Sequence, residues 1–360
     1  GGPGSSGLLG LFKEFGPLQI DRSGQAQPRS ETWNAEYGLL FVDSPVGTGF
    51  SSTALDSGYA QSQLDVARDL YTLLQGFYSI EPEQVNAPLY IAGESYGGHY
   101  VPSLCNYILE QRSLTVRSAS LEIPLAGLAI GDGFTDPPTQ VLAKPLQAEA
   151  FGLINSIERA MLDVWALNAS KLAKAGQWSL AYEERNKMEQ YVKMHSGVTL
   201  YDVRRMGDYD FSDIDEWANN AENKASLGVA RSVVYSTDSA VKAHLRDDEM
   251  KSYKHLFPAL LDPANKLRIL LYQGQFDWKD GTSSNLAWIN SIDWPGRSEF
   301  ANAPRHIWRG SDGAIGGYVQ MARNLCEIVV AGAGHLAPMD QPVHAHDMIR
   351  GFISGKLCSA

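Results

Sequence analysis

Cysteine is scarce in this chain of 360 residues, which contains only Cys105, Cys326 and Cys358. Their number is odd and their spacings show no pairs, so neither a disulfide framework nor a zinc site can be inferred from them. At most one bridge can form, and the simpler expectation is three free or buried thiols.

Long hydrophobic runs and an excess of positive charge are also lacking. The longest apolar run, from Ile123 to Ile130, is interrupted by Pro124 and Gly127 and is far shorter than the roughly 18 residues that cross a bilayer. Thirty basic against forty-one acidic residues leave a net charge of −11. Such a charge repels phosphate backbones and anionic membranes, so we expect no nucleic-acid partner and no membrane span.

The first residues, 1–4, contain neither an initiator Met nor an apolar signal segment. This start predicts a fragment whose upstream piece has been removed. The tripeptide Asn168-Ala169-Ser170 is an N-glycosylation acceptor, which is a weak indication of a secreted protein.

What the chain does have is ample core material, with 44% hydrophobic and 20% charged residues, and this composition excludes global disorder. Several runs are apolar throughout, as in strands of a parallel sheet covered on both faces. Helical spacing lies between them, and this alternation predicts a doubly wound α/β sheet. The expected strands are residues 38–42, 88–92, 125–130, 267–272 and 327–331, and the expected helices include 64–74, 104–108 and 348–352.

The stretch 137–262 differs from the rest because it lacks clear strand runs and is rich in Ala, Lys, Glu and Asp. We expect helices around 157–167 and 180–194 within it. The length allows two domains or one large domain with an insertion. The composition favours the second, with an α/β core formed by 1–136 and 263–360 and a helical cap formed by 137–262.

The pentapeptide Gly93-Glu94-Ser95-Tyr96-Gly97 matches the G-x-S-x-G pattern of a nucleophile elbow. It follows an expected strand and precedes a helical stretch, which is the context that such an elbow requires. A tight turn there lifts the Ser95 hydroxyl above the sheet and places the Tyr96 N–H where an oxyanion would form. An ordinary glycine-rich turn with a surface serine would lack that strand-turn-helix context.

A serine nucleophile needs a base and an acid that orients it, and in this kind of fold they follow in the order Ser, Asp or Glu, His. Asp277 comes soon after the expected strand 267–272, and His335 comes after the strand 327–331. Both stand at carboxyl ends of strands, where doubly wound folds gather their sites. We expect His99 to be structural, and His344 and His346 to be surface residues rather than metal ligands.

A series of further motifs, in order along almost the whole chain, resembles the serine carboxypeptidases, and most of all their vitellogenic-type branch. The motifs are GGPGSS at 1–6, EFGP at 14–17, Asn34, DSPVGTGFS at 43–51, GESYGGHYVP at 93–102, GDG at 131–133, YQGQFD at 272–277 and GHLAP at 334–338.

The resemblance implies an α/β-hydrolase fold with a largely parallel sheet and a helical cap, of which the N-terminal strands precede this chain. It also implies secretion, to a lysosome, a vacuole or the cell exterior. It implies catalysis without a metal or an organic cofactor.

Site residues follow from the same resemblance, position by position. Ser95 matches the nucleophile, His335 the general base and Asp277 its orienting acid. Gly2 and Tyr96 match the oxyanion donors. The remaining positions match groups that hold the substrate: Glu14, Glu94 and Gly1 for its terminal carboxylate, and Leu336 for a side-chain pocket.

The expected activity is hydrolysis of the last peptide bond of a peptide or protein at acid pH. Three alternatives remain. An acyltransferase of the same family would use the same triad with an alcohol as acceptor, a non-catalytic binding or scaffold protein would retain only the fold, and a general esterase or lipase would have a more apolar opening loop. Glu94 favours the peptidase, because a residue that binds a carboxylate suits a peptide terminus.

Overall fold

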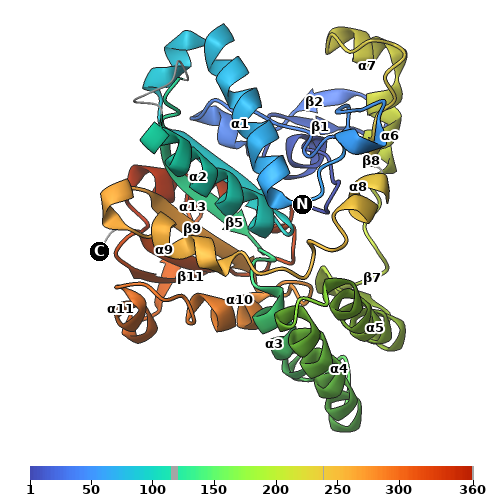
Figure 1. Cartoon of the computed structure of the whole chain (residues 1–360), viewed down its shortest axis with the longest axis vertical. Helices are drawn as coiled ribbons and strands as arrows, with labels where there is room; N and C mark the ends of the chain where they lie inside the picture. Colours follow the sequence, from blue (N-terminus) through green and yellow to red (C-terminus); the bar gives the residue numbers. More distant parts are fainter. Residues whose placement is uncertain (115–120, 238, 359–360) are drawn as a thin grey trace.

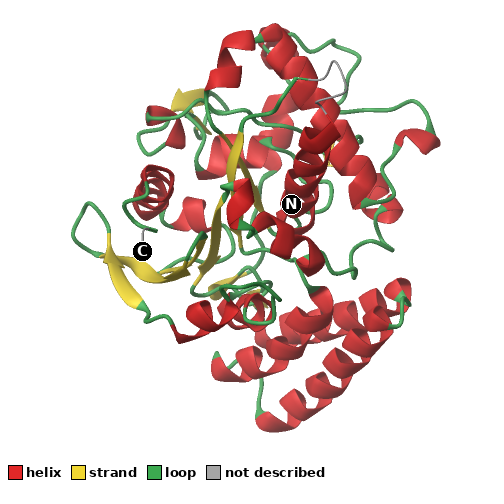
Figure 2. Cartoon of the chain, turned by 60° about the vertical axis from the view of Figure 1, so that its left-hand side comes forward, coloured by secondary structure: helices red, strands yellow, loops and turns green. Residues whose placement is uncertain are grey.

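The computed structural model describes residues 1–114, 121–237 and 239–358, and its centre is a six-stranded sheet of order β10-β11-β12-β9-β5-β4 (Figures 1 and 2). Strands β4, β5, β9 and β12 run parallel to one another, whereas β10 and β11 are antiparallel additions at one edge. The carboxyl ends of the four parallel strands therefore lie at the same edge. The strands are β4 Leu89–Glu94, β5 Leu125–Gly131, β9 Arg268–Gly274, β10 His306–Arg309, β11 Ile315–Ala322 and β12 Leu325–Val330.

Helices cover both faces of this sheet, which confirms the predicted α/β class. On β9, Ile269 and Leu271 face a core built with α1 and α2, whereas Leu270 and Tyr272 face a second core built with α13. Because both faces are buried, both alternating sets of side chains must be apolar, which explains the continuous apolar runs. The helices are α1 Gln63–Ile80, α2 Gly97–Leu114 and α13 Pro342–Ser354, and further ones in the core are α9 Phe257–Leu260, α10 Thr282–Ile289, α11 Arg297–Asn302 and α12 Ala337–Asp340.

Two expectations about the strands were wrong. Residues 38–42 form no strand in the described part of the chain. They are apolar because their side chains pack on other apolar groups, as Phe41 does when it stacks on Phe15 at 5.7 Å between ring centroids. Conversely, β10 and β11 were not predicted. Their hairpin leaves β10 largely exposed at the sheet edge, so the apolar run that marks a central strand is missing there.

The segment 137–262 is mainly helical, and the expected helices lie within α4 Ser156–Lys174 and α5 Trp178–Ser196. In Figure 1 these two project from the lower end of the molecule, whereas α6 and α7 lie towards the upper end, near β1 and β2. Short strands that were not expected also occur. The other elements are α3 Pro137–Ala150, β6 Val198–Thr199, β7 Asp202–Met206, α6 Ser212–Asn219, α7 Ala221–Ser226, β8 Ser236–Thr237 and α8 Ser239–His244, and outside the segment β1 Leu18–Ile20, β2 Ala26–Pro28 and β3 Thr48–Gly49.

The expectation of three free thiols was also wrong. A disulfide joins Cys326 on β12 to Cys358, with Cα atoms 5.8 Å apart, whereas Cys105 is free and buried. The turn that follows α13 returns the chain to the sheet, and this places two cysteines together that are 32 residues apart. No helix in the described ranges is long and apolar enough to cross a bilayer.

Candidate active site

Ser95 occupies a strained turn between β4 and α2. Its φ is +57°, in the left-handed region that non-glycine residues rarely adopt. The turn is held because the Ser95 N–H donates to Gly131 O at 2.9 Å. A Cβ at Gly93 would lie 2.7 Å from a Val101 methyl group, and one at Gly98 would lie 2.6 Å from Phe134 O. The strand, the helix and this backbone strain together form a nucleophile elbow.

His335 and Asp277 form a buried hydrogen-bonded pair. Nδ1 of His335 lies 2.8 Å from Oδ2 of Asp277, and the two residues are 1% and 0% exposed. The carboxylate also accepts the backbone N–H groups of Lys279, at 2.6 Å, and Asp280, at 3.1 Å. These bonds fix the plane of the carboxylate and direct the imidazole, whose Nε2 is buried and has no hydrogen-bond partner among the described residues.

The three predicted triad residues follow β4, β9 and β12 and so lie at the same edge of the sheet. The hydrogen bonds of the described residues join His335 to Asp277 but do not include one from His335 to Ser95. In enzymes without a substrate such contacts are often long and tighten only when substrate binds.

The predicted oxyanion donors lie on two separate segments. Tyr96 follows Ser95 in the elbow, and its buried side chain donates to Asp248 Oδ2 at 3.1 Å and stacks on His99. Gly2 has a φ of +106°, and a Cβ there would lie 2.7 Å from Gly4 N and Ser5 N, so only glycine fits. The neighbouring Gly1 lies against the elbow, since a Cβ on it would be 3.2 Å from Ser95 Cβ.

Glu14 and Glu94 form a pair of acids beside this elbow. Glu14 is 4% exposed, and burial raises its pKa to about 7. Burial, and next the negative charge of Glu14, raise the pKa of Glu94 well above its usual value. The structure thus brings together two carboxyl groups that are 80 residues apart, and their protons are held at a pH where exposed acids are ionised.

Sequence reasoning missed two residues that contact this site. The ring of Tyr201 lies edge-on to the His335 ring, with 4.8 Å between centroids. The backbone carbonyl of Tyr201 accepts a hydrogen bond from the backbone N–H of His335 at 2.7 Å. It comes from the segment 137–262, and no motif marks it. Asp132 follows β5, and one of its carboxyl oxygens, one carboxyl oxygen of Asp277 and one ring nitrogen of His335 all lie within 4.8 Å of one another. In the sequence Asp132 is marked only by the GDG motif at 131–133, which by itself indicates no role for the side chain.

The other predicted positions have mixed outcomes. Leu336 is buried beside His335. His99 is fully buried and its Nδ1 contacts Phe134 O, as expected of a structural residue. His344 was expected at the surface but is 7% exposed and lies 3.3 Å from Asp312, because α13 turns it towards β10. His346 is partly buried, 3.8 Å from Glu31.

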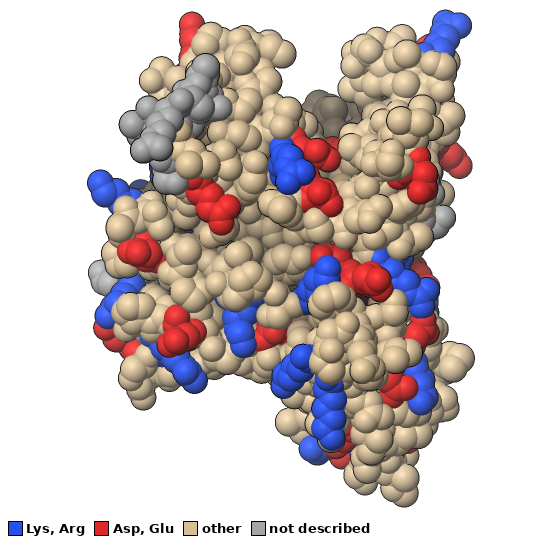
Figure 3. Space-filling model, in the orientation of Figure 1, with Lys and Arg blue, Asp and Glu red and all other residues tan. Residues whose placement is uncertain are grey.

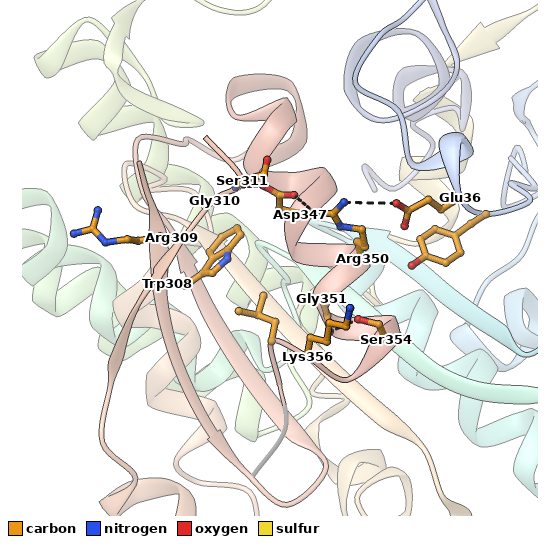
Figure 4. Close-up of a pocket in the computed structure, with 12 residues that line it drawn as sticks. Glu36, Trp308, Arg309, Gly310, Ser311, Asp347, Arg350, Gly351, Ser354 and Lys356 are labelled. Atoms are coloured by element: carbon orange, nitrogen blue, oxygen red, sulfur yellow. Dashed lines mark hydrogen bonds and ion pairs between the residues drawn. The ribbon is translucent and has the colours of Figure 1, made fainter. Parts of the chain in front are cut away.

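A cavity of about 690 Å³ lies elsewhere, between β10, α13 and the segment around Glu36 (Figure 4). None of the predicted site residues lines it. Arg350 there is paired with Asp347 at 2.7 Å and with Glu36 at 3.7 Å, so its charge is already compensated. On the face shown in Figure 3, Lys and Arg are interspersed with Asp and Glu, which is unlike a surface that binds nucleic acid.

Known proteins match nearly the entire chain. The family model described as serine carboxypeptidase matches residues 1–355. The serine carboxypeptidase-like 50 protein of Arabidopsis thaliana is 37% identical over 99% of this chain and 79% of its own length. The probable serine carboxypeptidases CPVL of Dictyostelium discoideum and Homo sapiens are 35% and 30% identical over 99% of the chain and 71% and 76% of their lengths.

A solved structure has the same fold. The crystal structure of Kex1(delta)p, a prohormone-processing carboxypeptidase from Saccharomyces cerevisiae, matches with a TM-score of 0.88 over 99% of this chain and 82% of that one, at 23% identity. The family model and the curated relatives cover the elbow, the His335–Asp277 pair and the acidic pair alike, so this chain belongs to the serine carboxypeptidase family.

Proposed function

We propose that this serine carboxypeptidase removes C-terminal residues from peptides or proteins with Ser95 as the nucleophile. His335 Nε2 takes the proton of Ser95 Oγ as that oxygen attacks the last peptide carbonyl, and then gives the proton to the leaving amine. Water then attacks the carbonyl of the acyl-enzyme. His335 Nε2 takes a proton from that water and returns it to Ser95 Oγ as the acid product leaves. Asp277 holds the imidazole with Nε2 free and stabilises it when it is charged.

The N–H groups of Tyr96 and Gly2 are proposed to bind the oxyanion of the tetrahedral intermediate. Support comes from the position of Tyr96 directly after the strained Ser95 and from the close packing of the 1–2 segment on the elbow. Donors that are already oriented cost no reorganisation when charge develops, which is why such groups contribute strongly to the rate.

The Glu14–Glu94 pair is the observation that favours a carboxypeptidase over an esterase. Two glutamic acids and a substrate carboxylate that lie close together cannot all be ionised at low cost, so at least one of the glutamic acids keeps its proton. A protonated carboxyl group donates a hydrogen bond to a substrate carboxylate, whereas an ionised one repels it. We propose that Glu14, Glu94 and the backbone of Gly1 hold the terminal carboxylate, which predicts that productive binding is best at acid pH.

The test is to incubate the protein, at acid pH, with N-blocked dipeptides that end in a free carboxylate or in an amide. Release of the C-terminal amino acid from the free acid, and its absence with Ser95→Ala, is the expected result. Addition of an alcohol distinguishes the acyltransferase, which would form an ester instead. No turnover of peptide or ester by folded wild-type protein would favour a binding or scaffold protein.

The segment 137–262 is proposed to act as a cap that controls access, and the contact of Tyr201 with His335 supports this role. If so, Tyr201→Ala changes the preference among peptides more than the cleavage of a small activated ester. Equal loss on every substrate, with the protein still folded, would contradict a cap.

A place in the secretory pathway, in a lysosome or vacuole or outside the cell, is the proposed location. The Cys326–Cys358 disulfide supports it, because such bonds persist in oxidising compartments. So does the exposure of Asn168 in the glycosylation acceptor. A mobility shift on treatment with an N-glycosidase, lost in Asn168→Gln, would show the modification; unmodified protein from a secreting host would contradict it.

A further inference from the structure

Asp132 is a buried acid at the carboxyl end of β5, between the strands that carry Ser95 and Asp277. It is fully buried, and its φ of +44° directs the chain sharply away from the sheet. Its N–H donates to Tyr272 O at 2.7 Å, and its Oδ1 accepts the Gly274 N–H at 2.8 Å. Its other oxygen, Oδ2, is buried and has no hydrogen-bond partner in the part of the chain that the structure describes.

The neighbours of the Asp132 carboxyl group are Asp277, which is proposed to orient the imidazole, and His335, which is proposed to carry the proton. One carboxyl oxygen of Asp132, one of Asp277 and one nitrogen of His335 all lie within 4.8 Å of one another. Two buried carboxylates at this distance cannot both be ionised at low cost. One of the pair must therefore hold a proton.

The hydrogen bonds decide which acid is neutral. The Asp277 carboxylate accepts three donors, namely the imidazole of His335 and the N–H groups of Lys279 and Asp280. Three donors favour the ionised form. Among the described residues, the Asp132 side chain accepts a hydrogen bond only from the Gly274 N–H, which leaves Oδ2 free to carry a proton.

The charged and titratable groups around Asp132 agree with this assignment. Glu94 on β4 adds a negative charge only when it is ionised, and that charge would raise the pKa of Asp132 further. Tyr272 on β9 is a neutral phenol, and the His335 imidazole is already bonded to Asp277. Lys279, which follows Asp277 by two residues, directs its ammonium group to Glu189, 2.5 Å away. Burial first, and the charge of Asp277 next, raise the pKa of Asp132 well above its usual value.

We propose that Asp132 is a positioning residue, whose protonated carboxyl group donates a hydrogen bond from Oδ2 to the Asp277 carboxylate. The inference rests on the proposed roles of Ser95, His335 and Asp277. This bond holds Asp277 in the plane that directs His335. It also adds no second negative charge beside the imidazole, where such a charge would favour the inactive imidazolium.

The test compares Asp132→Asn with Asp132→Gly. An Asn amide reproduces the protonated acid, because its oxygen can accept from Gly274 and its NH₂ can donate to Asp277, and Asn also tolerates a positive φ. Glycine removes the side chain without backbone strain. The substrate is a blocked peptide ester, which has no free carboxylate, so that the binding of a carboxylate by the Glu14–Glu94 pair does not enter the measurement.

We expect Asp132→Asn to keep a kcat close to that of the wild type, with the acid limb of its kcat/KM profile at the same pH. Asp132→Gly should lower kcat by about 10- to 100-fold with little change in KM, as expected when a hydrogen bond to a charged group is lost. Glu327→Gln, a buried acid on β12 changed in the same way, is the control and should move neither quantity.

Three outcomes would overturn the inference. An acid limb that moves to lower pH by about one unit or more in Asp132→Asn would mean that Asp132 is charged in the wild type. Loss of activity in Asp132→Asn, or wild-type kcat in Asp132→Gly, would show that donation to Asp277 is not what the residue supplies. If the glycine variant does not fold, the asparagine profile still decides. Ser95→Ala, measured in parallel, separates the two proposals, because activity in that variant contradicts the nucleophile itself.

Discussion

His335 and Asp277 are joined by a buried hydrogen bond of 2.8 Å between Nδ1 and Oδ2, although 58 residues separate them in the sequence. Each follows a strand of the same parallel sheet, β12 and β9, and these two strands are direct neighbours. The bond therefore depends on strand order rather than on any local motif. It fixes the tautomer, because a proton on Nδ1 leaves Nε2 as the free base.

Replacement of Ser95 by Ala should abolish labelling by an organophosphate and nearly all hydrolysis. His335→Ala should cost a similar amount, because triad residues act as a unit and their losses do not add. Asp277→Asn should lower kcat by roughly 10⁴-fold, the size seen when the tautomer is lost in other triads. The measurement is peptide hydrolysis beside active-site titration, and a Ser95→Ala protein that still cleaves peptides would contradict the assignment.

The acidic pair predicts how peptide binding depends on pH. Glu14 is protonated below about pH 7, so the hydrogen bond to a substrate carboxylate is present in acid and is lost as pH rises through that value. We expect KM for peptides with a free carboxylate to rise from acid towards neutral pH, while kcat is better preserved because His335 must be neutral to act as base.

Matched substrates and one variant test that dependence. Peptide amides lack the third negative charge and should keep their KM at higher pH. Glu94→Gln should flatten the curve for free acids, because an amide donates at any pH. Identical pH curves for acid and amide substrates in the wild type would show that the pair does not bind the carboxylate.

Glu327 predicts a pH dependence of stability. It is 2% exposed on β12, and burial raises its pKa to about 8, whereas an unfolded chain has a Glu pKa of about 4.3. Between these values the native state holds a proton that the unfolded state has lost. This group should therefore lower the free energy of unfolding by up to about 1.4 kcal/mol per pH unit as pH rises.

Urea unfolding between pH 5 and 8, chosen as roughly the window between those two pKa values, provides the measurement. Glu327→Gln should show a smaller fall in stability than the wild type. The exposed Glu83→Gln is the control and should follow the wild-type curve. Parallel curves for wild type and Glu327→Gln would mean that the Glu327 proton is not retained on folding.

A buried ion network connects α3 and α5 to the turn that carries Asp277. Lys144 is fully buried, 2.9 Å from Glu189 and 3.8 Å from Asp280. Lys144→Met should destabilise the protein by about 3 kcal/mol or more, since it removes the ammonium paired with the buried Asp280, whereas Glu189 keeps Lys279 and Arg185. It should also lower kcat, because the Asp280 N–H is bonded to Asp277.

Lys193 on α5, the helix that carries Glu189, offers a matched control. It is paired with Asp208 at 2.6 Å, but both side chains are exposed, at 43% and 57%. Lys193→Met should change the unfolding free energy by no more than about 1 kcal/mol. Denaturant unfolding of both variants decides the matter, and equal effects would mean that burial does not govern the network.

The amino-acid sequence by itself determined the parallel strands β4, β5, β9 and β12, the elbow and the long helices. Each depends on a local pattern. A strand buried on both faces must be apolar throughout. A tight strand-to-helix turn needs small residues two positions before and after Ser95, which here are Gly93 and Gly97. The order of the strand-ending residues was enough to select Asp277 and His335 as partners.

Only the tertiary structure decided the contacts between segments that are distant in the sequence. Asp132 lies beside Asp277 because β5 and β9 are adjacent, and Cys326 reaches Cys358 because the turn after α13 returns to the sheet. Glu94 lies near enough to Glu14 to feel its charge although 80 residues separate them. The protonation state of each buried acid follows from these contacts. A pKa depends on burial and on neighbouring charge, and both arise only when the chain is folded.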